Sequence, residues 1–208
     1  MKVDKFRTVI IYITIILLGL VCLLPLLNIV AISFSSSAAV EGNMVGLIPV
    51  GFSTAAYKKI LEDSQFWHSF LISVERVVLT LIINFVLIVL MAYPLSKTNA
   101  QFRGRNIYAN LMIFAMLFNG GMIPTFLLVK SYGLLNTIWA LVLPGAVPIF
   151  NVILVMNFFA AVPKELEEAA FIDGANPLQV LTKIFIPISK PVLATVSLFS
   201  IVGSWNDF

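Results

Sequence analysis

Long runs of residues without any charge limit most strongly what this chain can fold into. Val9–Ile32 contains 24 uncharged, mostly apolar residues in a row, and 107–129 and 138–159 are further runs of this kind. About 20 apolar residues in a helix are enough to cross the hydrocarbon core of a bilayer. Charged residues make up only 11% of the sequence, against about 25% in soluble domains. We therefore expect an integral membrane protein.

These runs predict an all-α protein, a polytopic transmembrane helix bundle that forms a single domain over residues 1–208. The first run is expected to be a retained span, because the apolar core of a signal peptide has only about 7–15 residues. The run 107–129 is interrupted by Asn119-Gly120-Gly121 and by Pro124, and the run 138–159 carries Pro144 and Pro148. The predicted spans are 9–32, 70–93, 107–129, 138–159 and 191–208.

The last apolar run is short for a membrane span. Pro191 to Trp205 is 15 residues, which makes a helix of about 22 Å, whereas the hydrocarbon core is about 30 Å thick. The sequence then stops at Phe208 without a basic or loop segment. We interpret the chain as a C-terminally truncated fragment.

Basic residues lie mostly on one side of the predicted spans. With the N-terminus inside, the inner segments hold nine lysines and arginines, and the outer segments hold Lys58, Lys59 and Lys130. Short loops on the cytoplasmic side of membrane proteins carry such an excess of positive charge. We therefore expect a cytoplasmic N-terminus and a cytoplasmic segment 160–190.

Segment 160–190, which we call the acidic loop, is the one strongly polar and acidic stretch between two long apolar runs. Pro163 suits a first helical position, and the glutamates that follow lie near the positive end of a helix dipole. Gly174 lies where the first helix should end with a residue in the left-handed backbone conformation. Asn176-Pro177 can then cap and begin a second helix. The loop is therefore expected to fold as a hairpin of two short helices.

The acidic loop also carries the spaced pattern Glu-Ala-Ala-x3-Gly-x9-Ile-x-(apolar)-Pro, from Glu168 to Pro187. This pattern resembles the cytoplasmic loop of the membrane subunits of binding-protein-dependent ABC importers. The whole chain is similar to the carbohydrate-importing branch, the maltose-type permeases. These relatives have six spans, so the resemblance implies that five of six are present here.

In that family the loop is the coupling helix, which docks in a groove of the ATP-hydrolysing subunit. The resemblance implies that Glu168 is the charged contact, that Ala169 and Ala170 allow close approach, and that Gly174 provides the turn. The full set of implied ATPase-coupling residues is Glu168, Ala169, Ala170, Asp173, Gly174, Ile184 and Pro187.

The resemblance also implies the partners and the location. These are a second permease subunit in a heterodimer, two ATP-binding subunits, an extracytoplasmic solute-binding protein and the lipid of a bacterial inner membrane, with no nucleic acid. No cofactor is expected. The sequence lacks the Gly-x4-Gly-Lys-Ser/Thr loop that binds nucleotide phosphates, so the chain is not expected to be an enzyme, and ATP hydrolysis is expected on another chain.

Uncharged polar residues inside the predicted spans are candidates for a substrate path. Each could instead form a hydrogen bond between helices, worth about 0.6 kcal/mol on average in a bilayer. Together they suit a neutral, hydroxyl-rich substrate better than an ion. The candidates are Asn84, Asn119, Asn151, Asn157 and Ser200.

Glu75 and Arg76 are the only charged residues inside a predicted span. A charge inside the membrane indicates a functional site by default. However, the rest of this predicted span, Val77–Tyr93, already provides 17 uncharged residues, and we therefore favour a position at the outer interface. His68 is expected to be interfacial too, and a single histidine without a cysteine or carboxylate cluster predicts no metal site.

Two other functions are open to a chain of this kind. An ion-coupled secondary transporter would need buried charged groups for coupling, and only Glu75 and Arg76 are available. A non-transporting membrane scaffold would leave the acidic loop without a purpose. The expected function is therefore the transmembrane permease subunit of an ATP-driven importer, which translocates a sugar or oligosaccharide by alternating access.

Overall fold

The structure, a computed structural model, describes residues 5–118 and 120–207, and every regular element in these ranges is a helix. The chain divides into two compact units, Met1–Ser69 and Phe70–Phe208, and each is described separately below. The prediction of an all-α protein is confirmed for the described residues.

The first unit contains a long apolar helix and a short polar connection. α1 (Lys5–Ser33) runs through Pro25 without ending. Within the first unit, no other described element covers its most apolar window, as expected for side chains that face lipid. α2 (Ser37–Glu41) and α3 (Ala55–Glu62) follow. Near them the ring of Phe34 lies 5.0 Å from that of Tyr57.

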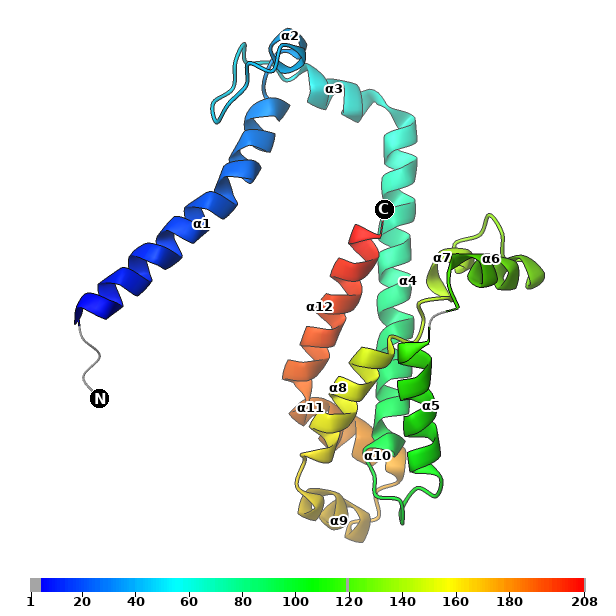
Figure 1. The fold of residues 1–208 in the computed structure, drawn as a ribbon. Coiled ribbons are helices and arrows are strands. Elements are labelled where there is room, and N and C mark those ends of the chain that lie inside the picture. Colours follow the sequence, from blue (N-terminus) through cyan, green and yellow to red (C-terminus); the bar gives the residue numbers. More distant parts are fainter. Residues whose placement is uncertain (1–4, 119, 208) are drawn as a thin grey trace. The chain divides into compact units, whose positions relative to one another are not determined.

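The second unit is built on α4 (Ser64–Leu95), which begins in the first unit and is 32 residues long. Its buried residues Ile88 and Ala92 belong to one apolar cluster with Val155 of α8 and Val196 of α12. Figure 1 shows α4 beside α8 and α12, with α9 and α10 at one end of these helices. The remaining elements are α5 (Arg105–Leu117), α6 (Met122–Ser131), α7 (Trp139–Val142), α8 (Ile149–Ala160), α9 (Lys164–Ile172), α10 (Pro177–Val180), a π-helix η1 (Leu181–Phe185), α11 (Ile186–Ile188) and α12 (Lys190–Asn206).

Two described helices, α1 and α4, are long and apolar enough to cross a bilayer on their own. Three pairs of helices reach that length only together, and each pair bends by more than 40°: α5 with α6, α8 with α9, and residues 177–188 with α12. The described residues therefore hold between two and five candidate spans.

The predicted third and fourth spans are broken helices. α5 ends at Leu117 and α6 begins at Met122, around the glycines that marked the interruption. Only Trp139–Val142 and Ile149–Ala160 are helical in the predicted fourth span. Pro148 lies directly before α8, and since proline has no N–H group it cannot donate the bond that would continue a helix.

Candidate functional site

The acidic loop folds as a capped helical hairpin. α9 ends at Ile172, and the N–H groups of Gly174 and Ala175 donate to the carbonyls of Phe171 and Ala170, at 3.1 and 2.9 Å. This pair of bonds is the Schellman arrangement, which satisfies the last carbonyls of a helix. The predicted C-terminal cap at Gly174 is therefore confirmed. Pro163 lies one position earlier than expected, as the residue that precedes the helix.

The second half of the hairpin begins with a reciprocal cap. The side chain of Asn176 accepts a hydrogen bond from the Gln179 N–H, and the Gln179 side chain accepts one from the Asn176 N–H, each at 2.9 Å. Pro177 is the first residue of α10. This confirms the prediction that Asn176-Pro177 caps and begins a second helix. Because both ends of the turn are capped, the hairpin has a defined shape that a partner protein can recognise.

Gly174 has a φ of +82°. Side chains with a β-carbon reach this left-handed region only at a cost of about 1–2 kcal/mol. A β-carbon at Gly174 would meet no atom of this chain within 4 Å. Glycine is therefore favoured here by backbone conformation and not by lack of space within the chain.

The implied coupling residues divide between two faces of the hairpin. Ala170 and Ile184 pack against the apolar cluster of this chain. Glu168, Ala169, Asp173, Gly174 and Pro187 are exposed. Beside them lie large apolar side chains that the rest of the chain leaves uncovered, and Ile172 is 86% exposed. Capped hairpins with exposed apolar side chains are suited to docking another protein. These exposed apolar residues are Leu166, Phe171, Ile172 and Leu178.

One ion pair attaches the hairpin to the end of α4. Lys97 Nζ lies 2.7 Å from a carboxylate oxygen of Glu167, and the two side chains are only 13% and 11% exposed. The ammonium also lies 4.1 Å from the ring centroid of Tyr93 and 4.2 Å from that of Phe185. Lys97 therefore contacts the end of α4, α9 and η1 at once. Sequence reasoning did not find this pair, because nothing local shows that residues 70 positions apart meet. Glu168, the implied contact to the ATP-hydrolysing subunit, is exposed beside it.

A second group of polar residues surrounds a cavity of about 220 Å³ between α4, α12 and the segment that leads into α8. The side-chain amide of Asn84 lies 3.3 Å from the Ser200 hydroxyl. When the oxygen and nitrogen of this amide are exchanged by a half-turn, its nitrogen donates to the Ala146 carbonyl at 2.9 Å. We call this the polar cavity. Its polar lining residues are Arg76, Thr80, Asn84, Asn151, Ser200, Ser204 and Asp207.

The structure brings together three of the five residues predicted for the substrate path. Asn84, Asn151 and Ser200 all line the polar cavity and are buried. Asn157 is exposed on α8 and is not part of this lining. Asn119 lies outside the described residues.

Glu75 and Arg76 have different surroundings in the structure, and their expected position at the outer interface stays a prediction. Glu75 is exposed, whereas Arg76 is buried, and Arg76 Nη2 lies 2.5 Å from a carboxylate oxygen of Asp207 on the last turn of the chain. One face of α4 turns into the protein, and adjacent residues of a helix point in directions about 100° apart. The intramembrane charge was the signal in the sequence, but its partner, 131 positions away, was not predictable.

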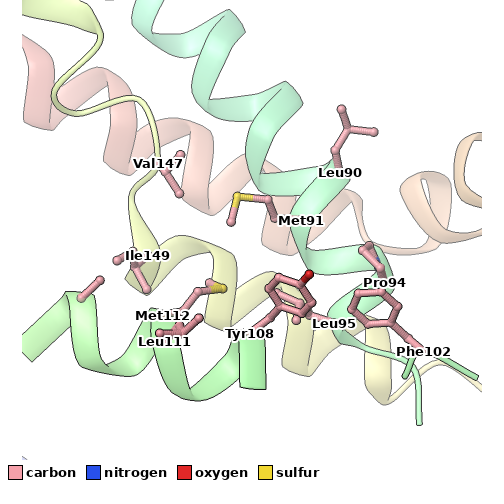
Figure 2. A pocket seen from close by; sticks show the side chains of 11 residues that line it. Leu90, Met91, Pro94, Leu95, Phe102, Tyr108, Leu111, Met112, Val147 and Ile149 are labelled. Carbon is pink, nitrogen blue, oxygen red and sulfur yellow. The ribbon is translucent and has the colours of Figure 1, made fainter. Parts of the chain in front are cut away.

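A larger cavity, of about 420 Å³, lies between α4 and α5. Figure 2 shows that the labelled side chains around it are almost entirely hydrocarbon, including Leu90, Met91 and Leu111. A saccharide there would leave most of its hydroxyl groups without hydrogen bonds, at a cost of about 1–3 kcal/mol for each such group. This cavity is therefore not a candidate sugar site. Among the described residues, no three histidine, cysteine or acidic side chains are grouped to hold a metal ion.

The comparisons with known proteins agree with these features. Residues 48–208 match the family described as the binding-protein-dependent transport system inner membrane component. The chain belongs to this family. The resemblance inferred from the acidic loop is thereby confirmed, and the Glu-Ala-Ala pattern lies within the matched residues.

Two curated members of the family come from Bacillus subtilis (strain 168). The chain is 45% identical to Protein LplC over 91% of its own length and 64% of that protein. It is 43% identical to a polygalacturonan/rhamnogalacturonan transport system permease protein, YtcP, over 99% of its own length and 71% of that protein. The chain thus spans about two-thirds of the length of these relatives.

One solved structure shares the fold closely. It is the crystal structure of a bacterial ABC transporter involved in the import of the acidic polysaccharide alginate. The match has a TM-score of 0.90 at 36% identity and covers all of this chain and 73% of the other. At this identity the similarity indicates common descent as well as a common fold.

Proposed function

We propose that this chain is the membrane-spanning permease subunit of an ATP-driven importer that carries a saccharide across the inner membrane by alternating access. The single observation that carries the proposal is the position of α4. One end of this helix is bound to the acidic loop through Lys97 and Glu167. Arg76, Thr80 and Asn84, farther along it, line the polar cavity. One rigid element therefore connects a docking loop with a polar path.

The exposed face of the acidic loop is the surface on which the ATP-binding subunit docks. Glu168 supplies a charged contact, and the apolar side chains of Phe171 and Ile172 supply buried area in the complex. Closure of two ATP-binding subunits moves the loop, and the Lys97–Glu167 pair transmits this movement to α4. The proposal places the acidic loop and the N-terminus in the cytoplasm, in agreement with the excess of basic residues in the inner segments.

The remaining partners follow from the family. A second permease subunit completes the path in a heterodimer, and an extracytoplasmic solute-binding protein delivers the saccharide. ATP hydrolysis takes place on the separate ATP-binding subunits. The saccharide class is supported by the two relatives named for polygalacturonan and alginate and by the amide and hydroxyl side chains of the polar cavity.

Uptake by the complete importer in proteoliposomes tests the proposal. The full-length permease, its partner permease, the ATP-binding subunits and the solute-binding protein are reconstituted together, and radiolabelled oligogalacturonate is added outside. We expect accumulation that requires hydrolysable ATP and persists when ionophores remove ion gradients. Uptake driven by an ion gradient without ATP would instead indicate a secondary transporter.

A further inference from the structure

We propose that α3 is an interfacial membrane helix, whose apolar face lies among the headgroups and upper acyl chains of the phospholipid bilayer where α1 ends. The partner of this face is thus lipid and not another protein. The inference goes beyond the proposed function, because it needs neither the transported saccharide nor the ATP-binding subunits. In the orientation proposed above, this membrane surface is the outer one.

The first step is the distribution of side chains around α3. Tyr57, Ile60 and Leu61 have the spacing i, i+3, i+4, which places them on one face of a helix. All three are exposed, and Leu61 is 60% exposed. An apolar face opposite a charged one is typical of helices that lie in the plane of a membrane surface. The charged face of α3 consists of Lys58, Lys59 and Glu62.

The second step is the height of α3 relative to the bilayer. The uncharged run of α1 ends at Ile32, and a membrane helix leaves the hydrocarbon core near the end of such a run. The Tyr57 hydroxyl donates a hydrogen bond to the Ser33 hydroxyl at 2.8 Å, and the Tyr57 ring centroid lies 5.0 Å from that of Phe34. The face of α3 that carries Tyr57 is therefore turned toward the end of α1, and a protein that approaches from the water meets the charged face first.

The other end of α3 is held in a similar way. Asp63 is the one residue between α3 and α4, and its carboxylate accepts a hydrogen bond from the Gln65 N–H at 2.9 Å. The Trp67 indole N–H donates to the Leu61 carbonyl at 3.0 Å, and tryptophan is enriched at the membrane–water interface. Figure 1 shows α3 between the end of α1 and the first turn of α4. Both ends of α3 are thus tied to helices long and apolar enough to cross a bilayer.

The third step identifies what drives the contact. The two lysines of α3 are balanced by Glu62 and the adjacent Asp63, so burial of apolar area drives the contact, and not attraction to anionic lipid. Phe52 adds to this area, since it is 73% exposed and its ring stacks on Phe34 at 5.7 Å. The area is small, but a helix tethered next to the bilayer binds it in an intramolecular step, at a high effective concentration. A weak affinity for lipid is therefore sufficient.

Spin labels on α3 test this inference in the complete importer, reconstituted in phospholipid nanodiscs. After replacement of Cys22, single cysteines are labelled, and collisions are measured with oxygen, which dissolves in lipid, and with a nickel chelate, which dissolves in water. We expect the ratio of oxygen to nickel collisions to be several times higher on the apolar face, at a depth of about 5–10 Å. The labelled positions are Ile60 and Leu61 on the apolar face, and Lys58, Lys59 and Glu62 on the charged face.

Two double variants separate binding to lipid from mere proximity to it. The reporter is a label at Ala56, which lies one turn before Ile60 on the same face. Ile60→Gln with Leu61→Gln should lower the ratio at Ala56 severalfold. Lys58→Gln with Lys59→Gln is the matched control and should leave the ratio unchanged. Addition of anionic phosphatidylglycerol to neutral nanodiscs should also leave it unchanged, because no net charge attracts α3 to the lipid.

Three results would overturn the inference. Nickel collisions that dominate on both faces would show that α3 stands in water. Few collisions with either reagent at Ile60 and Leu61 would show that a protein covers the apolar face. An unchanged ratio at Ala56 after Ile60→Gln with Leu61→Gln would show that the neighbouring spans alone set the depth of α3.

Discussion

Lys97 and Glu167 are 70 positions apart in the sequence, yet the ammonium of one lies 2.7 Å from the carboxylate of the other. Both side chains are nearly buried, and the rings of Tyr93 and Phe185 flank the ammonium. Cations gain about 0.5–2 kcal/mol over such rings. The contact therefore joins the end of α4 to both halves of the acidic loop.

Removing the charge of Lys97 should uncouple ATP hydrolysis from uptake. Lys97→Met leaves the Glu167 carboxylate buried without its partner, which typically costs about 3–5 kcal/mol for a buried pair. We expect the loop to dock on the ATP-binding subunit but to move without α4. The measurement is the amount of saccharide accumulated per ATP hydrolysed in proteoliposomes, and we expect this ratio to fall at least severalfold.

Two controls accompany the Lys97 variant. Lys130→Met removes an exposed lysine on α6 and should keep the ratio. The exchange Lys97→Glu with Glu167→Lys restores opposite charges and should recover part of it. A normal ratio in Lys97→Met would contradict the proposed transmission.

The two neighbouring glutamates should have different effects when truncated. Glu168 is exposed and Glu167 is buried. Glu168→Ala should reduce co-purification of the ATP-binding subunit only modestly, because a contact that stays partly wet is worth about 0–1 kcal/mol. Glu167→Ala should leave co-purification near normal but lower uptake per ATP. The reverse order of effects would mean that Glu167, and not Glu168, faces the partner.

Backbone conformation at Gly174 gives a third prediction. Gly174→Val should abolish ATP-dependent uptake at matched membrane levels, because a β-branched residue is strongly disfavoured at a φ of +82°. Gly174→Asn should keep much of the uptake, since asparagine adopts this region most readily among residues with a β-carbon. Equal loss in both variants would indicate that the partner surface excludes any side chain at this position.

Labelling of single cysteines tests the orientation. After replacement of the exposed Cys22, a cysteine at Gln179 should react only with reagents applied from the cytoplasm. Cysteines at Lys58 and Ser131 should react from outside, as the distribution of basic residues predicts. A cysteine at Arg103 should react from the cytoplasm, like the one at Gln179. All four of these positions are exposed in the structure. Labelling of Gln179 from outside would overturn the placement of the acidic loop and the docking of an ATP-binding subunit on it.

Local sequence signals were sufficient for much of the acidic loop. The Gly174 cap and the Asn176–Gln179 capping box depend on residues within a few positions of each other, so their chemistry can be read from the sequence. The π-helix η1 was not foreseen, although Pro187 lies two residues after its end. The same type of apolar run, however, produced a continuous helix in α1 and broken helices after residue 105.

The sequence by itself determined that the chain is apolar and helical, that it belongs in a membrane, and that its acidic loop is a capped hairpin. These properties follow from composition and from interactions between near neighbours. Only the tertiary structure decided that Glu167 and not Glu168 meets Lys97. It also decided that Arg76 is buried beside Asp207, and that Asn84, Asn151 and Ser200 share a cavity which Asn157 does not reach. Such pairings depend on the rotation and packing of helices that are far apart in sequence, and no local pattern specifies which faces will meet.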